Sequence, residues 1–374
     1  MALTLTEDQE LIAKTARDFV LEESPVSRMR ALRDSGDATG FSRDLWKQMA
    51  ELGWVGIPFP ESVGGAGMGF AELALVLEAL GRNLAPEPFL SSVLLGGQAL
   101  LLAGDERQQA QWLTPLVRGE TLLALAYQEA KSRYDVNRIE THAEKQGAGY
   151  RLHGEKVHVL DGHVADAIVV SALSDGGVSL FVVPADAPGL RRTRQIRMDS
   201  RGAAGVTLDG VSVGPEALLG EAGRAGPIAL QIVDRATVGL CAEMLGGMSQ
   251  AFDLTLAYLK EREQFGVRIG TFQALKHRAA RLYIEIELAR SAVMAASRAV
   301  DDDDPELPKL VSLAKARCSD GYVLAGNEGV QMFGGVGMTD EYDIGLYLKR
   351  ARAAELSFGD SAWHRDRWAR LSGY

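Results

Sequence analysis

Two segments in the last third of the chain decide its fold, Arg262-Glu-Gln-Phe-Gly266 and Gln331-Met-Phe-Gly-Gly-Val-Gly337. They lie in a region where apolar residues recur at helical spacing, over residues 228–258, 272–300 and 310–330. Periodic segments of these lengths are typical of an antiparallel four-helix bundle, whose long helices are joined by short connections. The sequence therefore predicts a C-terminal helical bundle with both polar, glycine-bearing segments near helix ends.

The regions before this bundle have different patterns. Between residues 123 and 225, short β-branched runs at 150–154, 167–171 and 178–183 are bounded by Gly, Asp or Pro, which predicts an antiparallel sheet or barrel. From about residue 5 to residue 120 helical spacing prevails. We expect an α+β fold in three domains, which are an all-α N-terminal domain at 1–122, a middle β-barrel domain at 123–225 and the C-terminal antiparallel four-helix bundle at 226–374.

Composition narrows the classes of function. The net charge of −10 argues against a nucleic-acid partner or an anionic membrane surface, although a local basic pocket is compatible with it. No run of about 18 apolar residues occurs and the N-terminus is polar, so a cytoplasmic location is expected. Cys241 and Cys318 lie in apolar helical pattern and are predicted to be small core residues. No pair of histidines or cysteines has metal-ligand spacing, so no metal site is expected.

Further motifs in the N-terminal region point to one family. Pro58-Phe-Pro-Glu61 is followed by Gly64-Gly-Ala-Gly67 and by Glu78-Ala-Leu-Gly-Arg82. Together with the two C-terminal segments and the domain order, these motifs resemble the acyl-CoA dehydrogenase family over essentially the whole chain. The resemblance implies FAD-dependent α,β-dehydrogenation of an acyl-CoA thioester, as in β-oxidation, with electron-transfer flavoprotein as the electron acceptor. It also implies a homo-oligomer or an α2β2 assembly with a homologous subunit.

The resemblance places FAD on the C-terminal motifs. The positions that match those holding FAD in the family are Arg262, Gln264, Phe265, Gln273, Gln331 and Gly335. Gly334, which precedes Gly335, is added to this predicted set. Their chemistry fits, because a guanidinium offers planar donors to pyrophosphate oxygens and a glutamine can bond adenine or ribose edges. Glycines let the backbone approach the ligand, and Phe265 would supply an apolar face. In the family each FAD spans two subunits, and these positions hold the tail of the neighbour's FAD.

The motifs that cover the flavin ring depart from the family pattern. Gln128-Glu-Ala-Lys-Ser-Arg-Tyr-Asp135 stands at the start of the β domain, and His158-Val-Leu160 stands where the family has tryptophan, isoleucine and threonine. Gln128 and Leu160 are the predicted flavin-side contacts, and Leu160 has only its backbone N–H to donate. The variant is similar to a subgroup that includes the small subunit of pimeloyl-CoA dehydrogenase.

The position of the family's catalytic glutamate is altered as well, because the chain reads Phe358-Gly359 there. Glu243 is the candidate replacement base, since it interrupts an apolar helical stretch that in the family lines the acyl tunnel. The alternative is a structural ion pair for Glu243, for example with Arg235 or Arg281. Asp360 is expected to be a surface or helix-capping residue rather than a base.

Three functions remain open at this stage. The chain is a dehydrogenase that supplies its own base, a catalytically silent subunit that completes the FAD site of a homologous partner, or a flavoenzyme of the same fold with altered chemistry. Two other segments have simpler interpretations. Gly64-Gly-Ala-Gly67 is expected to be a plain turn rather than a phosphate cradle, and the acidic run at 301–304 is expected to be a solvated loop between helices.

Overall fold

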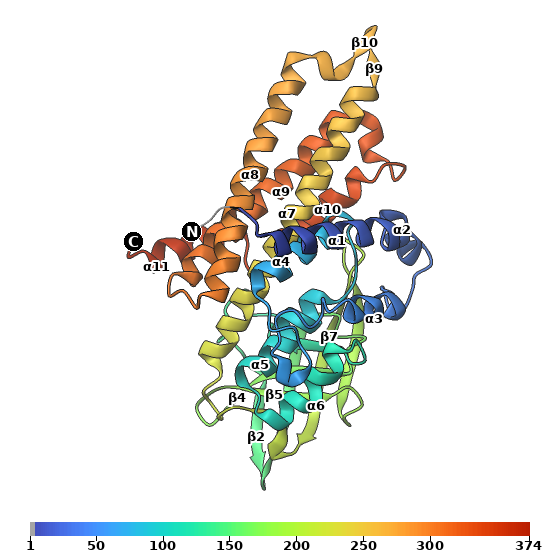
Figure 1. Ribbon diagram of the computed structural model, residues 1–374. Helices are drawn as coiled ribbons and strands as arrows, with labels where there is room; N and C mark the ends of the chain where they lie inside the picture. Colours follow the sequence, from blue (N-terminus) through green and yellow to red (C-terminus); the bar gives the residue numbers. More distant parts are fainter. Residues whose placement is uncertain (1–3) are drawn as a thin grey trace. The chain divides into compact units, whose positions relative to one another are not determined.

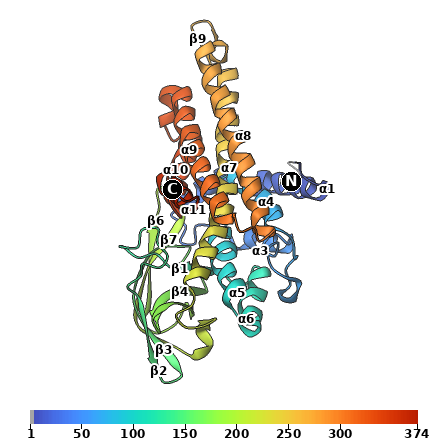
Figure 2. The ribbon, with the colours of Figure 1, turned by 90° about the vertical axis from the view of Figure 1, so that its left-hand side faces the viewer.

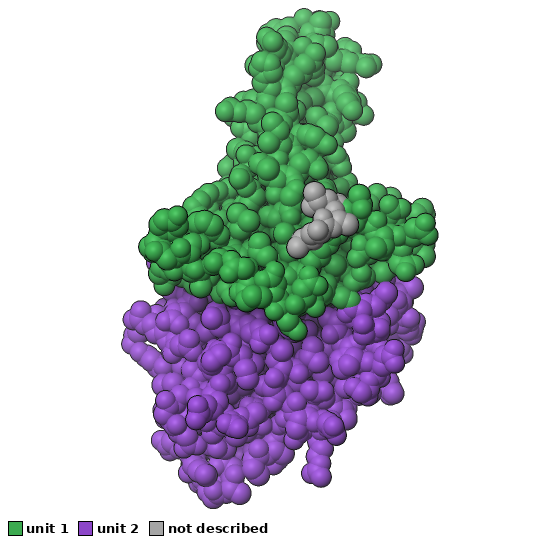
Figure 3. Space-filling view, turned by 60° about the vertical axis from the view of Figure 1, so that its left-hand side comes forward, with its two compact units in different colours: residues 1–31, 69–85, 237–374 green, residues 32–68, 86–236 purple. Residues whose placement is uncertain are grey.

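The computed structural model describes residues 4–374, which follow the predicted order of helices, sheet and helices (Figure 1). The chain forms two compact units, which Figure 3 distinguishes by colour. Unit 1 contains residues 1–31, 69–85 and 237–374, and unit 2 contains residues 32–68 and 86–236. Within the described part of the chain, no helix is long and apolar enough to cross a membrane.

Long helices dominate the C-terminal part of the chain (Figure 2). The three predicted helices are confirmed and two shorter ones follow, giving α7 (Gly226–Glu261), α8 (Gln273–Asp301), α9 (Leu307–Phe333), α10 (Ile344–Leu356) and α11 (Ser361–Leu371). A small hairpin, β9 (Glu263–Gln264) and β10 (Val267–Arg268), connects α7 to α8. Cys241 on α7 and Cys318 on α9 are buried and form no disulfide, as predicted for core residues.

Two helices from the N-terminal third belong to unit 1. They are α1 (Glu7–Glu23), which begins with a capping box between Thr6 and Gln9, and α4 (Phe70–Arg82). Gly69 has no side chain to cap α4, and Asp301 at the end of α8 accepts the backbone N–H groups of Phe70 and Ala71 instead. The acidic run is therefore a loop only after its first residue.

Four further helices and one π-helical segment come from the N-terminal third of the chain, and the π-helical segment packs against β1 (Leu123–Ala126). They are α2 (Val26–Asp34), α3 (Arg43–Glu51), α5 (Gln98–Ala103) and α6 (Glu106–Val117), with a π-helical segment η2 (Phe89–Gly97). The glycine segment 64–67 is the expected turn, because its amides bond to carbonyls of residues 56–61. Gly65 also packs so closely on Phe59 that a Cβ there would lie 2.1 Å from its carbonyl oxygen.

The middle of the chain is an eight-stranded, mostly antiparallel sheet with the strand order β6-β7-β3-β2-β4-β5-β8. Its strands are β1 (Leu123–Ala126), β2 (His142–Gln146), β3 (Gly149–Leu160), β4 (Ala167–Ser174), β5 (Gly177–Pro184), β6 (Leu190–Ile196), β7 (Gly202–Val213) and β8 (Leu218–Leu219). The first strand pairs parallel to β4. Alternate residues such as Leu152, Val170 and Val206 build one apolar core.

Candidate functional site

The end of the helical bundle that carries β9 and β10 contains a hollow of about 490 Å³. It is lined by Tyr258, Arg262, Gln264, Ile269, Leu275, Arg278 and residues 331–336. Five of the predicted FAD-binding residues are therefore brought together here, namely Arg262, Gln264, Gln331, Gly334 and Gly335. The two sequence segments are far apart in the chain. They meet because α8 runs antiparallel to α7 and α9 runs antiparallel to α8, so α7 and α9 end at the same end of the bundle.

Local structure explains the shape of this hollow. After α7 ends, Phe265 and Gly266 have φ angles of +54° and +77°, which give the tight two-residue turn of the hairpin. The N–H of Ile269 donates to the carbonyl of Arg262 at 2.8 Å and closes the hairpin base. On the facing side, Gly334 ends α9 with φ +70°. The stacked rings of Tyr258 and Phe333, 4.2 Å apart, form an aromatic wall beside it.

The charges of the hollow suit an anionic ligand. Arg278 is paired with Glu328. Arg262 is exposed and makes no side-chain hydrogen bond or ion pair within residues 4–374. Its guanidinium is therefore available for a phosphate. A Cβ at Gly334 or Gly335 would project into open space, so the backbone at both positions is accessible to a ligand.

Two predicted residues lie outside this hollow. Phe265 is at the tip of the hairpin, is 91% exposed and meets Phe272 edge to face. Gln273 is exposed at the first residue of α8. Both are at the same end of the bundle as Arg262, but neither lines the hollow.

The flavin-side positions belong to the sheet of unit 2. Gln128 follows β1, and its carbonyl accepts the N–H of Val157 in β3 at 2.9 Å. Leu160 ends β3 opposite Ala203, just after an irregularity at which His158 has φ +53°. A left-handed non-glycine residue is strained, and the irregularity shifts the register of the last residues of β3 relative to β7.

A buried ion pair holds the segment next to Gln128. The ammonium of Lys156 lies 2.8 Å from the Glu129 carboxylate and 3.0 Å from the Ser171 hydroxyl. Burial lowers the pKa of Lys156 to about 8. Burial alone would raise the pKa of Glu129, but the hydrogen bonds from Lys156, Thr141 and the Glu140 backbone outweigh it and hold that pKa below its usual value. The pair thus fixes the loop between β1 and β2.

The turn at Phe358-Gly359 is tightly held within unit 1. Phe358 is buried with φ +61°, and Gly359 has φ +117°. The ammonium of Lys315 donates to the Gly359 carbonyl at 2.7 Å and to that of Glu355 at 2.9 Å. The Nε2–H of His364 donates to the Phe358 carbonyl at 3.1 Å. The backbone turn is therefore maintained although its first side chain cannot accept a proton.

Burial lowers the pKa of both residues that hold this turn. Lys315 is fully buried on α9, which lowers its pKa to about 8. Burial, together with Lys315 and Arg367, lowers the pKa of His364 to about 3, so its imidazole is neutral at pH 7. Sequence reasoning missed both residues, and the one available signal was a lysine in an apolar stretch of α9.

Glu243 lies in a buried ion pair. Its Oε1 accepts from Arg350 Nε at 2.8 Å and lies 2.7 Å from Nη2. The partner comes from α10, whereas Arg235 of the expected pair donates to Gln98. Asp360 caps α11 by accepting the Trp363 N–H at 2.8 Å, as predicted.

Comparison with known proteins identifies the class. Residues 6–120, 124–211 and 227–372 match the N-terminal, middle and C-terminal domains of acyl-CoA dehydrogenase. The chain belongs to the acyl-CoA dehydrogenase family.

Particular relatives resemble it over their full length. A probable acyl-CoA dehydrogenase of Bacillus subtilis, YngJ, is 32% identical, with 98% of both chains covered. The structure of butyryl-CoA dehydrogenase from Megasphaera elsdenii is 25% identical with a TM-score of 0.93, and both chains are fully covered. A chain of the ChsE4-ChsE5 complex from Mycobacterium tuberculosis is 29% identical with a TM-score of 0.92, again over both full chains.

Proposed function

We propose that this chain is an FAD-dependent acyl-CoA dehydrogenase that oxidises an acyl-CoA thioester between its α and β carbons. The observation that carries the proposal is the hollow at the end of the bundle, because it gathers five residues of the predicted FAD-binding set. Family membership supports the same reaction class.

The residues of the hollow fit the tail of FAD. Arg262 would bind the pyrophosphate, since its planar donors match phosphate oxygens and no carboxylate of the described chain occupies them. Gln331 and Gln264 would bond the adenosine, and the backbone at Gly334 and Gly335 would pass against it. When bound, FAD supplies the hydride acceptor. We also propose Phe265 and Gln273 as contacts of the same ligand from the outer side of the hairpin.

On the sheet, Gln128 and Leu160 are proposed to contact the flavin ring. The neighbouring Glu129–Lys156 pair would position Gln128, because it anchors the loop that follows β1. Leu160 would contribute its backbone N–H in place of a side-chain donor.

Glu243 is the proposed base for the acidic proton next to the thioester. Its carboxylate is buried in a largely apolar part of α7, and the contacts that it makes there set a condition on this role. Because Arg350 compensates its charge at 2.7–2.8 Å, proton abstraction requires the Glu243 carboxylate to exchange part of this pair for the substrate.

The second candidate function is a non-catalytic subunit of a heteromeric α2β2 enzyme. Phe358 in place of a carboxylate favours it, and so does the pairing of Glu243 with Arg350. The exposed Phe265 favours it too, because an uncovered aromatic ring at a hairpin tip suits a neighbouring subunit. A relative is described as one complex of two differently named chains, ChsE4 and ChsE5. We propose that the chain belongs to the subgroup similar to the small subunit of pimeloyl-CoA dehydrogenase.

We base the proposed electron acceptor, cellular location and partner subunit on the same family. Electrons would leave through an electron-transfer flavoprotein, and the location would be cytoplasmic. A homologous acyl-CoA dehydrogenase chain is the proposed partner, with a homo-oligomer as the other arrangement.

The experiment is anaerobic bleaching of the flavin by a panel of acyl-CoA thioesters, with and without a co-expressed homologous subunit. If Glu243 is the base, Glu243→Gln retains flavin and loses bleaching by at least a hundredfold, because the substitution keeps the volume and most hydrogen bonding. Unchanged bleaching in Glu243→Gln excludes Glu243 as the base, and bleaching that also requires the co-expressed subunit assigns the proton transfer to that subunit. If the protein holds flavin but no acyl-CoA thioester bleaches it, with or without the co-expressed subunit, the proposed dehydrogenation is wrong.

A further inference from the structure

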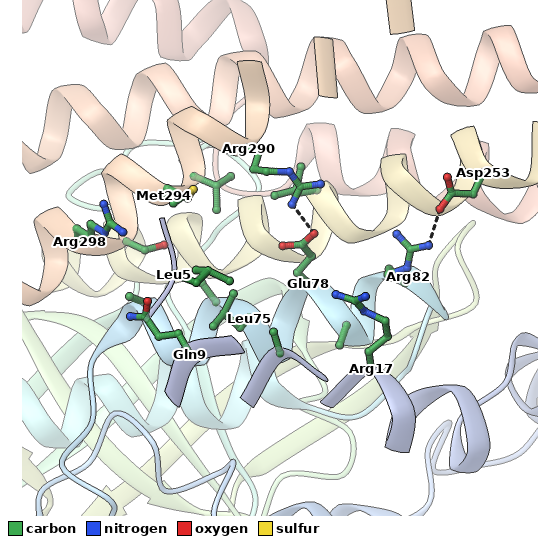
Figure 4. Close-up of a pocket in the computed structure, with 17 residues that line it drawn as sticks. Leu5, Gln9, Arg17, Leu75, Glu78, Arg82, Asp253, Arg290, Met294 and Arg298 are labelled. Atoms are coloured by element: carbon green, nitrogen blue, oxygen red, sulfur yellow. Dashed lines mark hydrogen bonds and ion pairs between the residues drawn. The ribbon is translucent and has the colours of Figure 1, made fainter. Parts of the chain in front are cut away.

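A second, larger hollow lies in unit 1 between α1, α4, α7 and α8, and its volume is about 530 Å³ (Figure 4). Ligand pockets of proteins span about 300–1,000 Å³, so this volume suits a small organic molecule. None of its lining residues is one of the residues proposed above for FAD or for the reaction.

Nine of the seventeen residues that line this hollow are apolar, and the other eight are polar or charged. The apolar lining consists of Leu5, Ala13, Ala71, Ala74, Leu75, Ala79, Leu245, Val293 and Met294. Four of these residues are alanines, so the space exists because small side chains face it from α1 and α4. Protein interiors are otherwise filled to near crystal density, and the apolar part of this wall favours contact with an aliphatic chain.

Most charges around the hollow are already compensated. Arg290 is 2.7 Å from Glu78, and Arg82 is 2.6 Å from Asp253. Figure 4 shows both contacts, with Arg17 extending toward the same end of the hollow as Arg82. In the part of the chain that the structure describes, the Arg17 side chain makes no hydrogen bond or ion pair. One end of this partly apolar hollow therefore presents an uncompensated cation.

A buried polar group completes the arrangement. Ser297 on α8 lines the hollow, is 2% exposed, and its hydroxyl has no hydrogen-bond partner among residues 4–374. A serine inside a helix usually bonds back to a carbonyl one turn earlier, and a buried hydroxyl without any partner is unfavourable. This unused donor and acceptor is satisfied when a ligand or its water reaches it.

We infer that this hollow binds an elongated aliphatic carboxylate, with its carboxylate on Arg17 and its chain along the alanine-lined walls. The inference is independent of the proposed function, because it uses no FAD-binding or reaction residue. A purely apolar ligand leaves Arg17 uncompensated, and a small inorganic anion leaves the apolar part of the wall unused.

The test titrates octanoate into the purified, flavin-containing protein by calorimetry, with 1-octanol as the uncharged probe of equal chain length. Arg17→Gln is expected to weaken octanoate binding at least tenfold, because it removes the carboxylate partner. The matched control is Lys14→Gln, which removes one positive charge from the same helix outside the hollow. Octanol is expected to bind at least tenfold more weakly than octanoate to the unaltered protein and equally to both variants.

A second pair of variants tests the apolar walls. Ala13→Leu narrows the hollow at its alanine-lined wall and is expected to weaken octanoate binding at least tenfold, whereas Thr15→Leu adds a similar side chain to an exposed position of α1 and leaves that binding unchanged. Flavin content and bleaching are expected to be the same in all four variants, which separates this site from the acyl-CoA site. Equal octanoate affinity in Arg17→Gln and Lys14→Gln, equal affinity in the two leucine variants, or no saturable octanoate binding to the unaltered protein overturns the inference.

Discussion

The two ends of the proposed chemistry are built differently in this chain. At the hollow of residues 262–336, Arg262 is exposed and has no carboxylate partner among residues 4–374, and the glycines leave the backbone open. At the turn of residues 358–359, Phe358 is buried and both carbonyls are bonded, and the candidate base Glu243 on α7 is paired with Arg350. The first region is prepared for a ligand from outside the chain. The second is satisfied internally, so these regions should respond to mutation in opposite ways.

The largest expected effect comes from breaking the internal pair. Arg350→Met leaves the Glu243 charge buried without its guanidinium, and we expect the free energy of unfolding to fall by about 3–5 kcal/mol. The matched control is Arg352→Met on the same helix, whose ion pair with Glu355 is half exposed and should contribute less than about 1 kcal/mol. Urea denaturation of both variants makes the comparison. If both lose the same stability, Glu243 is not held as a buried charge, and the contrast between the regions disappears.

The internal pair also has a test by compensation. Removing both partners, in Glu243→Leu with Arg350→Met, should recover most of the stability lost in the single variant, because no buried charge remains. The same double variant should still retain flavin if the hollow of residues 262–336 acts independently.

The residues of the open hollow could be predicted from the sequence, whereas the internal contacts of Glu243 and of the 358–359 turn could not. Arg262, Gln331 and the two glycines could be recognised because each belongs to a short, contiguous motif. Arg350 could not be predicted as the partner of Glu243, since 107 residues separate them and the choice depends on how α7 and α10 pack. Lys315 and His364 were missed for this reason as well, because their hydrogen-bond partners are backbone carbonyls that carry no sequence signal.

The order of elements and the three long helices were predictable from periodicity, whereas finer placements were not. Phe265 and Gln273 belong to the predicted set, but Phe265 lies at the exposed hairpin tip and Gln273 at the start of α8, and neither lines the hollow that Arg262 lines. Asp301 belongs to an acidic run that was expected to be a solvated loop. Because Gly69 has no side chain to cap α4, the carboxylate of Asp301 accepts a backbone N–H at the start of that helix. The domain boundaries at 122 and 225 stay a prediction.

The second effect is a pH dependence at the 358–359 turn. Burial lowers the pKa of Lys315 from 10.5 in the unfolded chain to about 8 in the folded protein, so the unfolded state binds more protons between these values. The contribution of Lys315 to stability should therefore rise as the pH increases from 8 to 10.5, by up to about 3 kcal/mol. Lys315→Met should lose this rise relative to the unaltered protein in urea denaturation at pH 7, 8, 9 and 10. A parallel pH profile in the two proteins would show that Lys315 is not desolvated.

The third effect concerns the open region. Arg262→Ala removes a charge-assisted phosphate contact and should weaken FAD retention by about 2–3 kcal/mol while leaving the unfolding midpoint unchanged. Arg281→Ala is the matched control, because Arg281 is exposed on α8 and does not line the hollow. Equilibrium dialysis against FAD gives both affinities. Equal affinities would remove Arg262 from the FAD site.

The smallest effect is expected at the start of α11. Asp360→Ala removes the side-chain cap on the Trp363 N–H and should cost about 1 kcal/mol of stability, whereas Asp360→Asn keeps an acceptor and should cost less. Flavin bleaching by acyl-CoA should be unchanged in both. A loss of bleaching without a loss of stability would instead make Asp360 part of the reaction.

The most direct measurement is the flavin-to-protein ratio of the purified chain, determined from its absorbance spectrum, alone and co-expressed with a homologous subunit, before and after reconstitution with FAD. We expect bound FAD to approach one per site in at least one of these preparations, and we expect Arg262→Ala to lose it and Arg281→Ala to retain it. A homogeneous, folded protein without flavin absorbance in every preparation would contradict it.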